Sequence, residues 1–160
     1  MRFLFALIHI FCLSICFSQK DDLSSAIYLE VGGSGGLGSI NYEKVFSNRE
    51  KIDFLWRVGL SIAPIDNNNG TGIVIPAMIH GTIGQKNHKL DMGLGQGITV
   101  STRGSFFLLT TASLGYRYHF KESPLFLRIA YTPLISYLLD FQVQHWAGIT
   151  IGFTLNTRKK

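Results

Sequence analysis

Histidine is the residue type here with the widest choice of chemistry, since its side chain serves as metal ligand, base or proton carrier near neutral pH. After the hydrophobic start of the chain, the histidines are His80, His88, His119 and His145. No two of them have the spacing of metal ligands on one element, and neither H-x-x-x-H nor C-x-x-C occurs. We therefore expect no metal site.

A glycine-rich run, GSGGLG at residues 33–38, fits the G-x-G-x-x-G pattern of dinucleotide-binding folds. Such a site also needs a helix that starts at the glycines and an acidic residue about 20 residues further on. The next residues, SINY at 39–42, have the pattern of a strand instead. We therefore expect no cofactor, and we assign the glycines to a tight hairpin and close strand packing.

The start of the chain has the pattern of a cleaved export signal. Arg2 precedes an almost wholly apolar run over 3–17, which is shorter than the roughly 20 residues that span a bilayer. Small residues at Ser18 and two places before it suit a peptidase that cuts after Ser18. We predict a signal peptide over 1–18 and one domain over 19–160, with an uncleaved N-terminal anchor as the alternative.

Cysteine content and charge indicate which covalent links, metal sites and binding partners the domain lacks. Both cysteines, Cys12 and Cys16, lie in the predicted signal, so the domain has no disulfide and no thiolate metal site. A lipid anchor on Cys16 is a further alternative, although Ile15 is large for the position before such a cysteine. The formal net charge is +5, but the basic residues are scattered and export is predicted, so we expect no nucleic-acid partner.

The rest of the chain alternates apolar and polar residues with period two, which is typical of β-strands with one apolar face. Turn-forming segments interrupt the alternation at regular intervals. Residues 26–46 read as two strands or as one long strand, and an even strand number favours two because it closes an antiparallel barrel. We predict eight strands, near 26–34, 37–46, 52–63, 72–83, 89–101, 105–120, 125–137 and 145–156.

Eight such strands match an all-β fold, an eight-stranded antiparallel up-and-down β-barrel. Gly, Ser and Thr dominate the polar rows, which carry too few charges for a face that meets water. We therefore predict a transmembrane barrel with the polar rows inside a narrow lumen and the apolar rows against lipid. The alternative is a soluble lipocalin-like barrel whose apolar rows line a ligand cavity.

Strand parity places three acids and three bases in the lumen, the balance that a desolvated interior requires. These residues are Glu30, Glu43, Arg57, Asp91, Arg117 and Arg128. We expect ion pairs between adjacent strands, Asp91 with Arg117 and Glu43 with Arg57, while Arg128 shares an acid or a water. The network is expected to fill and stiffen the lumen, and a gated proton or ion path is the alternative.

Aromatic residues fall where membrane barrels place their interface girdles. One group flanks the short turns and the other lies near the opposite rim: Phe46, Phe54, Tyr118 and Phe120, then Tyr131, Tyr137 and Trp146.

An export signal, an alternating domain, short turns opposite longer loops and the closing strand GITIGFTL at 148–155 together resemble the small outer-membrane β-barrels of the OmpA/OmpX type. The resemblance covers all of 19–160. It implies that the last strand is the signal read by the barrel-assembly machinery, although Leu155 replaces the usual terminal aromatic and residues 156–160 follow it. The residues of this assembly signal are Gly148, Ile149, Ile151, Gly152, Phe153 and Leu155.

The resemblance also implies a location and a role. We expect a monomer in the cell outer membrane, in contact with outer-membrane lipids and lipopolysaccharide, with a structural or surface-interaction role. Loops near 64–71 and 138–145 would face partners. The alternatives are a narrow ion channel and a lipid A-modifying enzyme. For the enzyme, His80 and Thr82 are the nearest histidine–hydroxyl pair, but His80 points inward and has no evident acid partner, so we expect no enzymatic activity.

Overall fold

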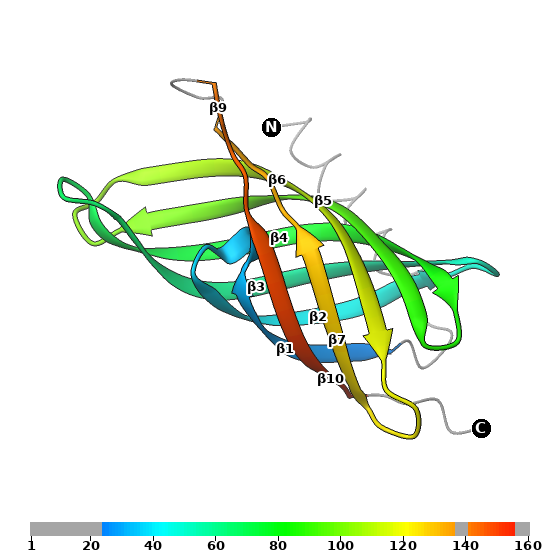
Figure 1. The fold of residues 1–160 in the computed structure, drawn as a ribbon. Coiled ribbons are helices and arrows are strands. Elements are labelled where there is room, and N and C mark those ends of the chain that lie inside the picture. The colour runs from blue at the N-terminus through cyan, green and yellow to red at the C-terminus, as the bar shows by residue number, and fades with distance from the viewer. Residues whose placement is uncertain (1–23, 137–140, 156–160) are drawn as a thin grey trace, which may run out of the picture.

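The computed structural model describes residues 24–136 and 141–155 (Figure 1). The segments that alternate with period two form antiparallel strands. Neighbouring strands pair edge to edge, and β1 pairs with β10 to complete a ring. Among these residues, no helix is long and apolar enough to cross a membrane. The elements in chain order are β1 (Ser25–Gly32), the 3-10 helix η1 (Gly33–Gly35), β2 (Gly38–Asn48), β3 (Ile52–Asp66), β4 (Gly70–Gln85), β5 (His88–Ser101), β6 (Phe106–His119), β7 (Leu125–Tyr131), β8 (Leu134–Ser136), β9 (Gln142–Gln144) and β10 (Ala147–Thr154).

Two barrel strands are each interrupted once, so the ten β elements form eight barrel strands. β7 and β8 follow β6 in one continuous register, with Tyr131 opposite Leu114 and Leu134 opposite Thr111. Pro133, between them, has no backbone N–H to donate and therefore breaks the ladder. β9 and β10 continue in one register along β8 and β7 in the same way. The predicted eight-stranded closed barrel is confirmed.

Most strand boundaries lie close to the predicted ranges. Residues 26–46 form two strands, as expected. The loop predicted over 64–71 is mostly strand instead, because β3 continues to Asp66 and β4 begins at Gly70. The loop predicted over 138–145 contains β9 in its described part. Some predictions fall outside the described residues: the signal peptide over 1–18, Tyr137, and the residues after Leu155.

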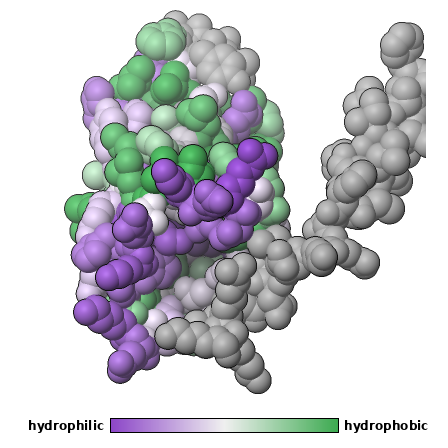
Figure 2. Space-filling view, turned by 90° about the vertical axis from the view of Figure 1, so that its right-hand side faces the viewer, coloured by the Kyte–Doolittle hydropathy of each residue, from purple (hydrophilic) through white to green (hydrophobic). Residues whose placement is uncertain are grey.

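The outer surface of the barrel is apolar and the interior is charged. Leu94 and Ile149 on the outward rows are 68% and 64% exposed, whereas Arg57 and Asp91 on the inward rows are 1% and 0% exposed. Figure 2 shows the end with the short turns, where hydrophilic side chains gather next to hydrophobic ones. This polarity is the one predicted for a membrane barrel, and it excludes a lipocalin-like arrangement with apolar rows around a cavity.

Glycines on the inward rows make room for larger side chains from neighbouring strands. A Cβ built on Gly93 would lie 2.6 Å from Nδ1 of His80, and one built on Gly152 would overlap the ring of Phe126. Phe126 in turn packs edge to face on Tyr28, with ring centroids 6.0 Å apart. An eight-stranded barrel is just wide enough for side chains to fill its interior. The inward glycines therefore allow rings and guanidinium groups to share that space.

Candidate functional site

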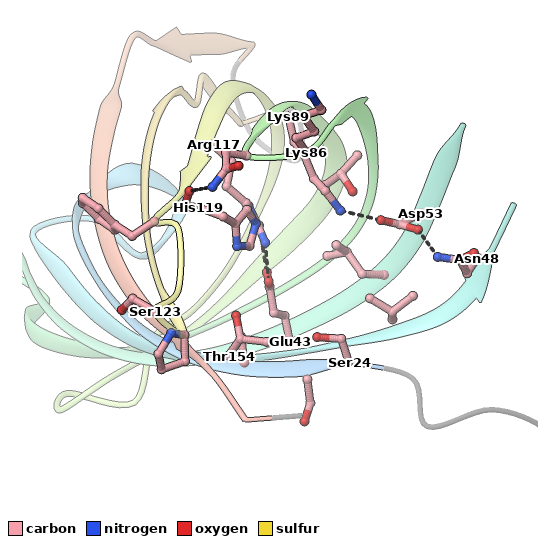
Figure 3. A pocket seen from close by; sticks show the side chains of 18 of the residues that line it. Ser24, Glu43, Asn48, Asp53, Lys86, Lys89, Arg117, His119, Ser123 and Thr154 are labelled. Atoms are coloured by element: carbon pink, nitrogen blue, oxygen red, sulfur yellow. Dashed lines mark hydrogen bonds and ion pairs between the residues drawn. The ribbon is translucent and has the colours of Figure 1, made fainter. Parts of the chain in front are cut away.

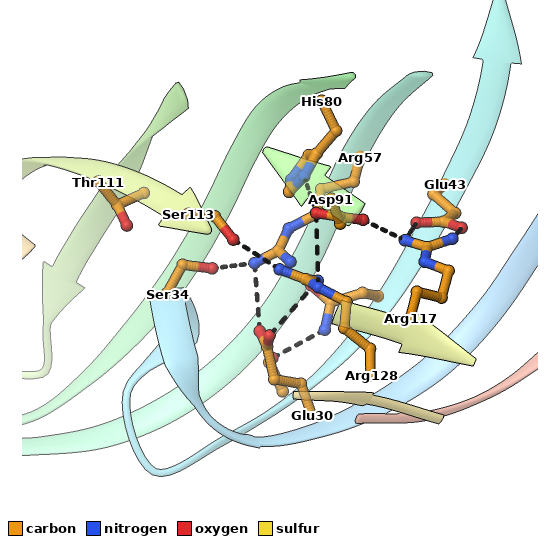
Figure 4. Close-up of polar contacts among 12 residues, drawn as sticks. Glu30, Ser34, Glu43, Arg57, His80, Asp91, Thr111, Ser113, Arg117 and Arg128 are labelled. Atoms are coloured by element: carbon orange, nitrogen blue, oxygen red, sulfur yellow. Dashed lines mark hydrogen bonds and ion pairs between the residues drawn. The ribbon is translucent and has the colours of Figure 1, made fainter. Parts of the chain in front are cut away.

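Asp91 lies at the centre of the charges buried in the lumen (Figure 4). Its carboxylate accepts a hydrogen bond of 2.8 Å from Arg117 and lies 3.5 Å from Nε of Arg128. Nδ1 of His80 lies 2.8 Å from the same carboxylate. β5 places Asp91 on an inward row, and β4, β6 and β7 place the three partners around it. The expected Asp91–Arg117 contact is therefore present, and Arg128 shares this acid.

Glu43 pairs with Arg117, and the expected pair between Glu43 and Arg57 does not form. Those two residues are directly opposite in the β2–β3 ladder, yet the guanidinium of Arg57 lies 3.1 Å from Glu30. Both terminal nitrogens of Arg117 donate to the two carboxylate oxygens of Glu43, the Nη2–Oε2 bond being 3.0 Å long. Barrel strands tilt and stagger, so residues at one height come from different positions along neighbouring strands. The long arginine side chains therefore reach acids across the lumen.

Glu30 holds the second half of the network. Besides Arg57, it has Nη1 of Arg128 at 3.7 Å. Two hydroxyls that the sequence analysis did not single out complete this half: Ser34 accepts from Arg57, and Ser113 accepts from Arg128 at 2.7 Å. Inward parity on β6 was the signal that could have found Ser113. All six charged residues expected in the lumen lie inside it and are connected through shared partners.

The connection between β1 and β2 folds into the lumen at the end opposite the short turns. Its three η1 residues are buried, and η1 contacts β3, β4 and β10. Gly33 has a φ of +78°, which glycine adopts without strain, and a Cβ there would lie 2.5 Å from the carboxyl carbon of Glu30. The glycine-rich run forms the hairpin that was expected, since β1 and β2 pair antiparallel up to the connection. Its inward direction was not expected: the glycines let the backbone enter the barrel and place Ser34 against Arg57.

His80 has an acid partner, contrary to expectation. Asp91 lies on the adjacent strand, and the sequence distance between the two residues hides this contact. Nε2 of His80 is buried and has no hydrogen-bond partner among the described residues. A catalytic base needs a nucleophile within reach of that nitrogen. The His80–Asp91 pair is thus one more link in the ionic network.

The other three histidines lie apart from the network. His119 ends β6 and lines the open mouth of the barrel. His88 and His145 are exposed, each with Nδ1 at the hydroxyl of a tyrosine, Tyr116 and Tyr131 respectively. Within the described part of the chain, no three His, Cys, Asp or Glu side chains gather as metal ligands would.

The end with the short turns opens into a cavity of about 1070 Å³, and most of the residues that line it are polar or charged (Figure 3). Arg117 and Glu43 belong to its wall, and Lys89 and Asp53 form an ion pair of 2.6 Å in it. With η1 at the far end and this cavity at the near end, the lumen has the form of a cup. The other polar or charged residues that line it include Ser24, Asn48, Lys86, Lys121, Glu122 and Thr154.

Those aromatic residues predicted for the interface that the structure describes lie near the two ends. At the short turns, Phe46 lies 6.4 Å from Phe54 and Tyr118 lies 5.3 Å from Phe120 between ring centroids. Tyr131, at the end of β7, stacks on a histidine at the other end. The sequence analysis missed one further outward pair, Tyr42 with Trp56 at 5.5 Å.

The closing strand β10 joins the two ends of the sheet. It pairs with β1 on one side and β7 on the other. Ile149, Ile151 and Phe153 point outward and are exposed, while Gly148 and Gly152 point inward and are buried. Recognition of this strand by an assembly machinery stays a prediction.

The longest hairpins extend the barrel wall at the end opposite the short turns. β2 pairs with β3 only as far as Ser61, so β3 continues beyond its neighbour to Asp66. Arg103, in the turn after β5, donates to the carbonyl oxygens of two asparagines in the turn after β3. Hydrogen bonds from the side chain and backbone of Asn69 hold the pKa of Asp66 below its usual value. The two exposed turns are thus joined by polar contacts.

This closed barrel, apolar outside and charged inside, is similar to solved structures. The N-terminal β-barrel domain of OprF from Pseudomonas aeruginosa matches with a TM-score of 0.55 at 10% identity, over 83% of this chain and 96% of that one. A transmembrane β-barrel designed de novo matches with a TM-score of 0.51 at 13% identity, over 87% of this chain and 100% of that one. The fold is that of the small outer-membrane β-barrels.

The outer-membrane-barrel fold agrees with the family resemblance found in the sequence. The Ail protein of Yersinia pestis matches with a TM-score of 0.48 at 12% identity, over 83% of this chain and 97% of that one. No protein-family model and no curated protein matches the chain.

Proposed function

We propose that the protein is an integral outer-membrane protein with a structural or surface-interaction role in the cell envelope. The observation that carries this proposal is the reversed polarity of the barrel, with apolar rows outside and ion pairs inside. Lipid solvates such an outer surface, and a ring of hydrogen-bonded strands leaves no backbone edge exposed to it. Its partners are outer-membrane lipids and lipopolysaccharide, together with the barrel-assembly machinery during biogenesis, and the mature protein is a monomer.

The surface-interaction part of the role is supported by the extended hairpins. β3 and β4 have 15 and 16 residues, whereas β1 and β2 have 8 and 11. The hydrogen bonds between Arg103 and the asparagine turn hold the two hairpin tips together. A partner outside the membrane would meet this joined surface before any other part of the wall.

The side chains in the lumen favour a filled barrel over a channel or an enzyme. η1 and the network around Asp91 occupy the space through which a solute would pass. A narrow channel would require these groups to move, and neutralising Arg57 or Arg117 would then change the conductance of a planar bilayer. A lipid A-modifying enzyme would change the mass of lipopolysaccharide and would lose this activity in the His80→Ala variant. We expect the unaltered protein to leave the mass of lipopolysaccharide unchanged.

Heat-modifiability tests the proposal. A closed membrane barrel resists SDS until it is heated, so the envelope protein should migrate differently in boiled and unboiled samples and should sediment with the outer membrane. Protein denatured in urea before loading is the control and should run at the boiled position. A single unshifted band, with the protein in the soluble periplasmic fraction, would overturn the proposal.

A further inference from the structure

The end with the short turns carries an excess of exposed basic residues. Within the described residues, none of these basic side chains forms an ion pair, whereas Lys89 nearby is already paired with Asp53. The exposed acids at this end are Glu50 and Glu122. We call the exposed basic residues of this end the basic rim: Lys44, Arg49, Lys51, Lys86 and Lys121.

The opposite end lacks such an excess in its described part. Asp66 and Arg103 are its exposed charged residues, and the guanidinium of Arg103 is held by backbone carbonyl groups. Each of the three hairpin turns at the near end, in contrast, carries a member of the basic rim. The hydrophilic side chains on this end stand out in Figure 2. The charge asymmetry therefore follows the barrel axis.

The basic rim lies next to outward aromatic pairs, with Lys44 on the membrane side of one pair and the other members in the turns beyond them. Lys44 on β2 is opposite Trp56, and the pair of Phe46 and Phe54 lies between it and the first short turn. Tyr118 and Phe120 pack together in the same way beside the third turn, close to Lys121. In membrane proteins, aromatic rings favour the level of the headgroups, and long basic side chains reach past them toward the water. The rim thus stands where lipid phosphates lie.

We infer that the basic rim binds the headgroups of anionic phospholipids in the leaflet that meets the short turns. The inference rests on the proposed function, since it requires the barrel to cross a bilayer. A phosphatidylglycerol headgroup has a net negative charge, whereas phosphatidylcholine has none, so a rim with few compensating acids selects the former. One Lys or Arg next to an anionic lipid surface strengthens binding about five-fold.

Lipid retention from a defined bilayer tests this inference. The protein is folded into vesicles of equimolar phosphatidylglycerol and phosphatidylcholine and extracted with styrene–maleic acid copolymer, and the lipids that remain are quantified by mass spectrometry. We expect phosphatidylglycerol to be enriched around the unaltered protein. A rim variant, with all five basic residues changed to glutamine, should lose this enrichment, so that the ratio of phosphatidylglycerol to phosphatidylcholine around it returns to the value of one in the vesicles. High salt should weaken the enrichment, because these charges are exposed.

Controls separate the possible failures. Arg103→Gln removes one basic residue from the other end and should leave the enrichment unchanged. Equal enrichment in the unaltered protein and the rim variant would overturn the inference, and so would enrichment that inorganic phosphate abolishes where sodium chloride of equal ionic strength does not. Each protein is first checked for a heat-dependent gel shift. Failure of that check in the unaltered protein would contradict the proposed function, whereas a normal shift without lipid preference contradicts only this inference.

Discussion

Replacing Asp91 with asparagine tests the lumen network at its most connected point. The substitution keeps the size of the side chain and removes a charge that is fully buried and contacts Arg117 at 2.8 Å, His80 at 2.8 Å and Arg128 at 3.5 Å. Two buried guanidinium groups then lose an acid that they share. Loss of one partner from a buried ion pair costs about 3–5 kcal/mol, so we expect Asp91→Asn to lower the free energy of unfolding by that amount.

The partly exposed pair of Asp53 with Lys89 provides a control. These side chains are 18% and 27% exposed, and water replaces the lost contact, so Asp53→Asn should cost about 0–1 kcal/mol. Both variants are measured by urea titration of vesicle-folded protein, with fluorescence of Trp56 and Trp146 as the signal. Equal losses of unfolding free energy in the two variants would refute the argument that water does not reach an unpaired charge in the lumen. A double-mutant cycle with Arg117→Gln should show that the second substitution costs less once Asp91 is neutral.

Three further changes probe other parts of the barrel. Gly93→Ala should cost about 1–3 kcal/mol, because the new Cβ would lie 2.6 Å from the His80 ring. Gly97→Ala, with no atom nearer than 3.8 Å, should leave the same urea titration nearly unchanged, and equal losses would contradict the packing argument. Leu94→Arg, on a side chain that is 68% exposed, should cost about 2–4 kcal/mol in vesicles, and an unaltered stability would mean that this face does not meet lipid. Asp66 has a lowered pKa, so its turn should be fully stabilised above the ordinary value of 3.8 and lose that stabilisation as pH falls through the lowered pKa. NMR titration of this carboxyl checks the shift, and a midpoint at or above 3.8 would contradict it.

Period two is the reason that the faces of the strands were predictable. A slip of one residue would move every side chain of a strand to the other face, so an apolar row such as Ile149, Ile151 and Phe153 fixes its own orientation. The same parity placed Glu30 and Asp91 inside. Strand faces and lumen residues therefore follow from local pattern, without knowledge of the partners.

Partners across the lumen depend on tilt and stagger, which local pattern does not contain. Glu43 and Arg57 are directly opposite each other in the β2–β3 ladder, and this position predicts an ion pair between them. In the barrel, Arg117 comes from a strand on the far side and takes Glu43 with both terminal nitrogens. The contact of His80 with Asp91 was missed because the two residues lie diagonally on the adjacent strands β4 and β5 and are not opposite each other in the ladder. Each error concerns which inward side chains meet and none concerns which side chains point inward.

The inward fold of η1 was also hidden. A glycine-rich run indicates a backbone that can turn tightly, but it does not indicate which way the turn folds. The run GSGGLG is compatible with a hairpin that points out of the barrel and with one that folds into it. Inside the barrel, Ser34 meets Arg57, and this contact with another strand is not contained in the local pattern of the run.

That inward turn links the first hairpin to the last strand. η1 belongs to the first hairpin, yet it packs against the last strand, where a Cβ on Gly148 would lie 3.0 Å from Cα of Gly33. The seam between β1 and β10 closes the ring. The segments that meet at this seam also meet inside the lumen, so a side chain added at Gly33 or Gly148 would disturb the closure of the ring and the filling of its far end together.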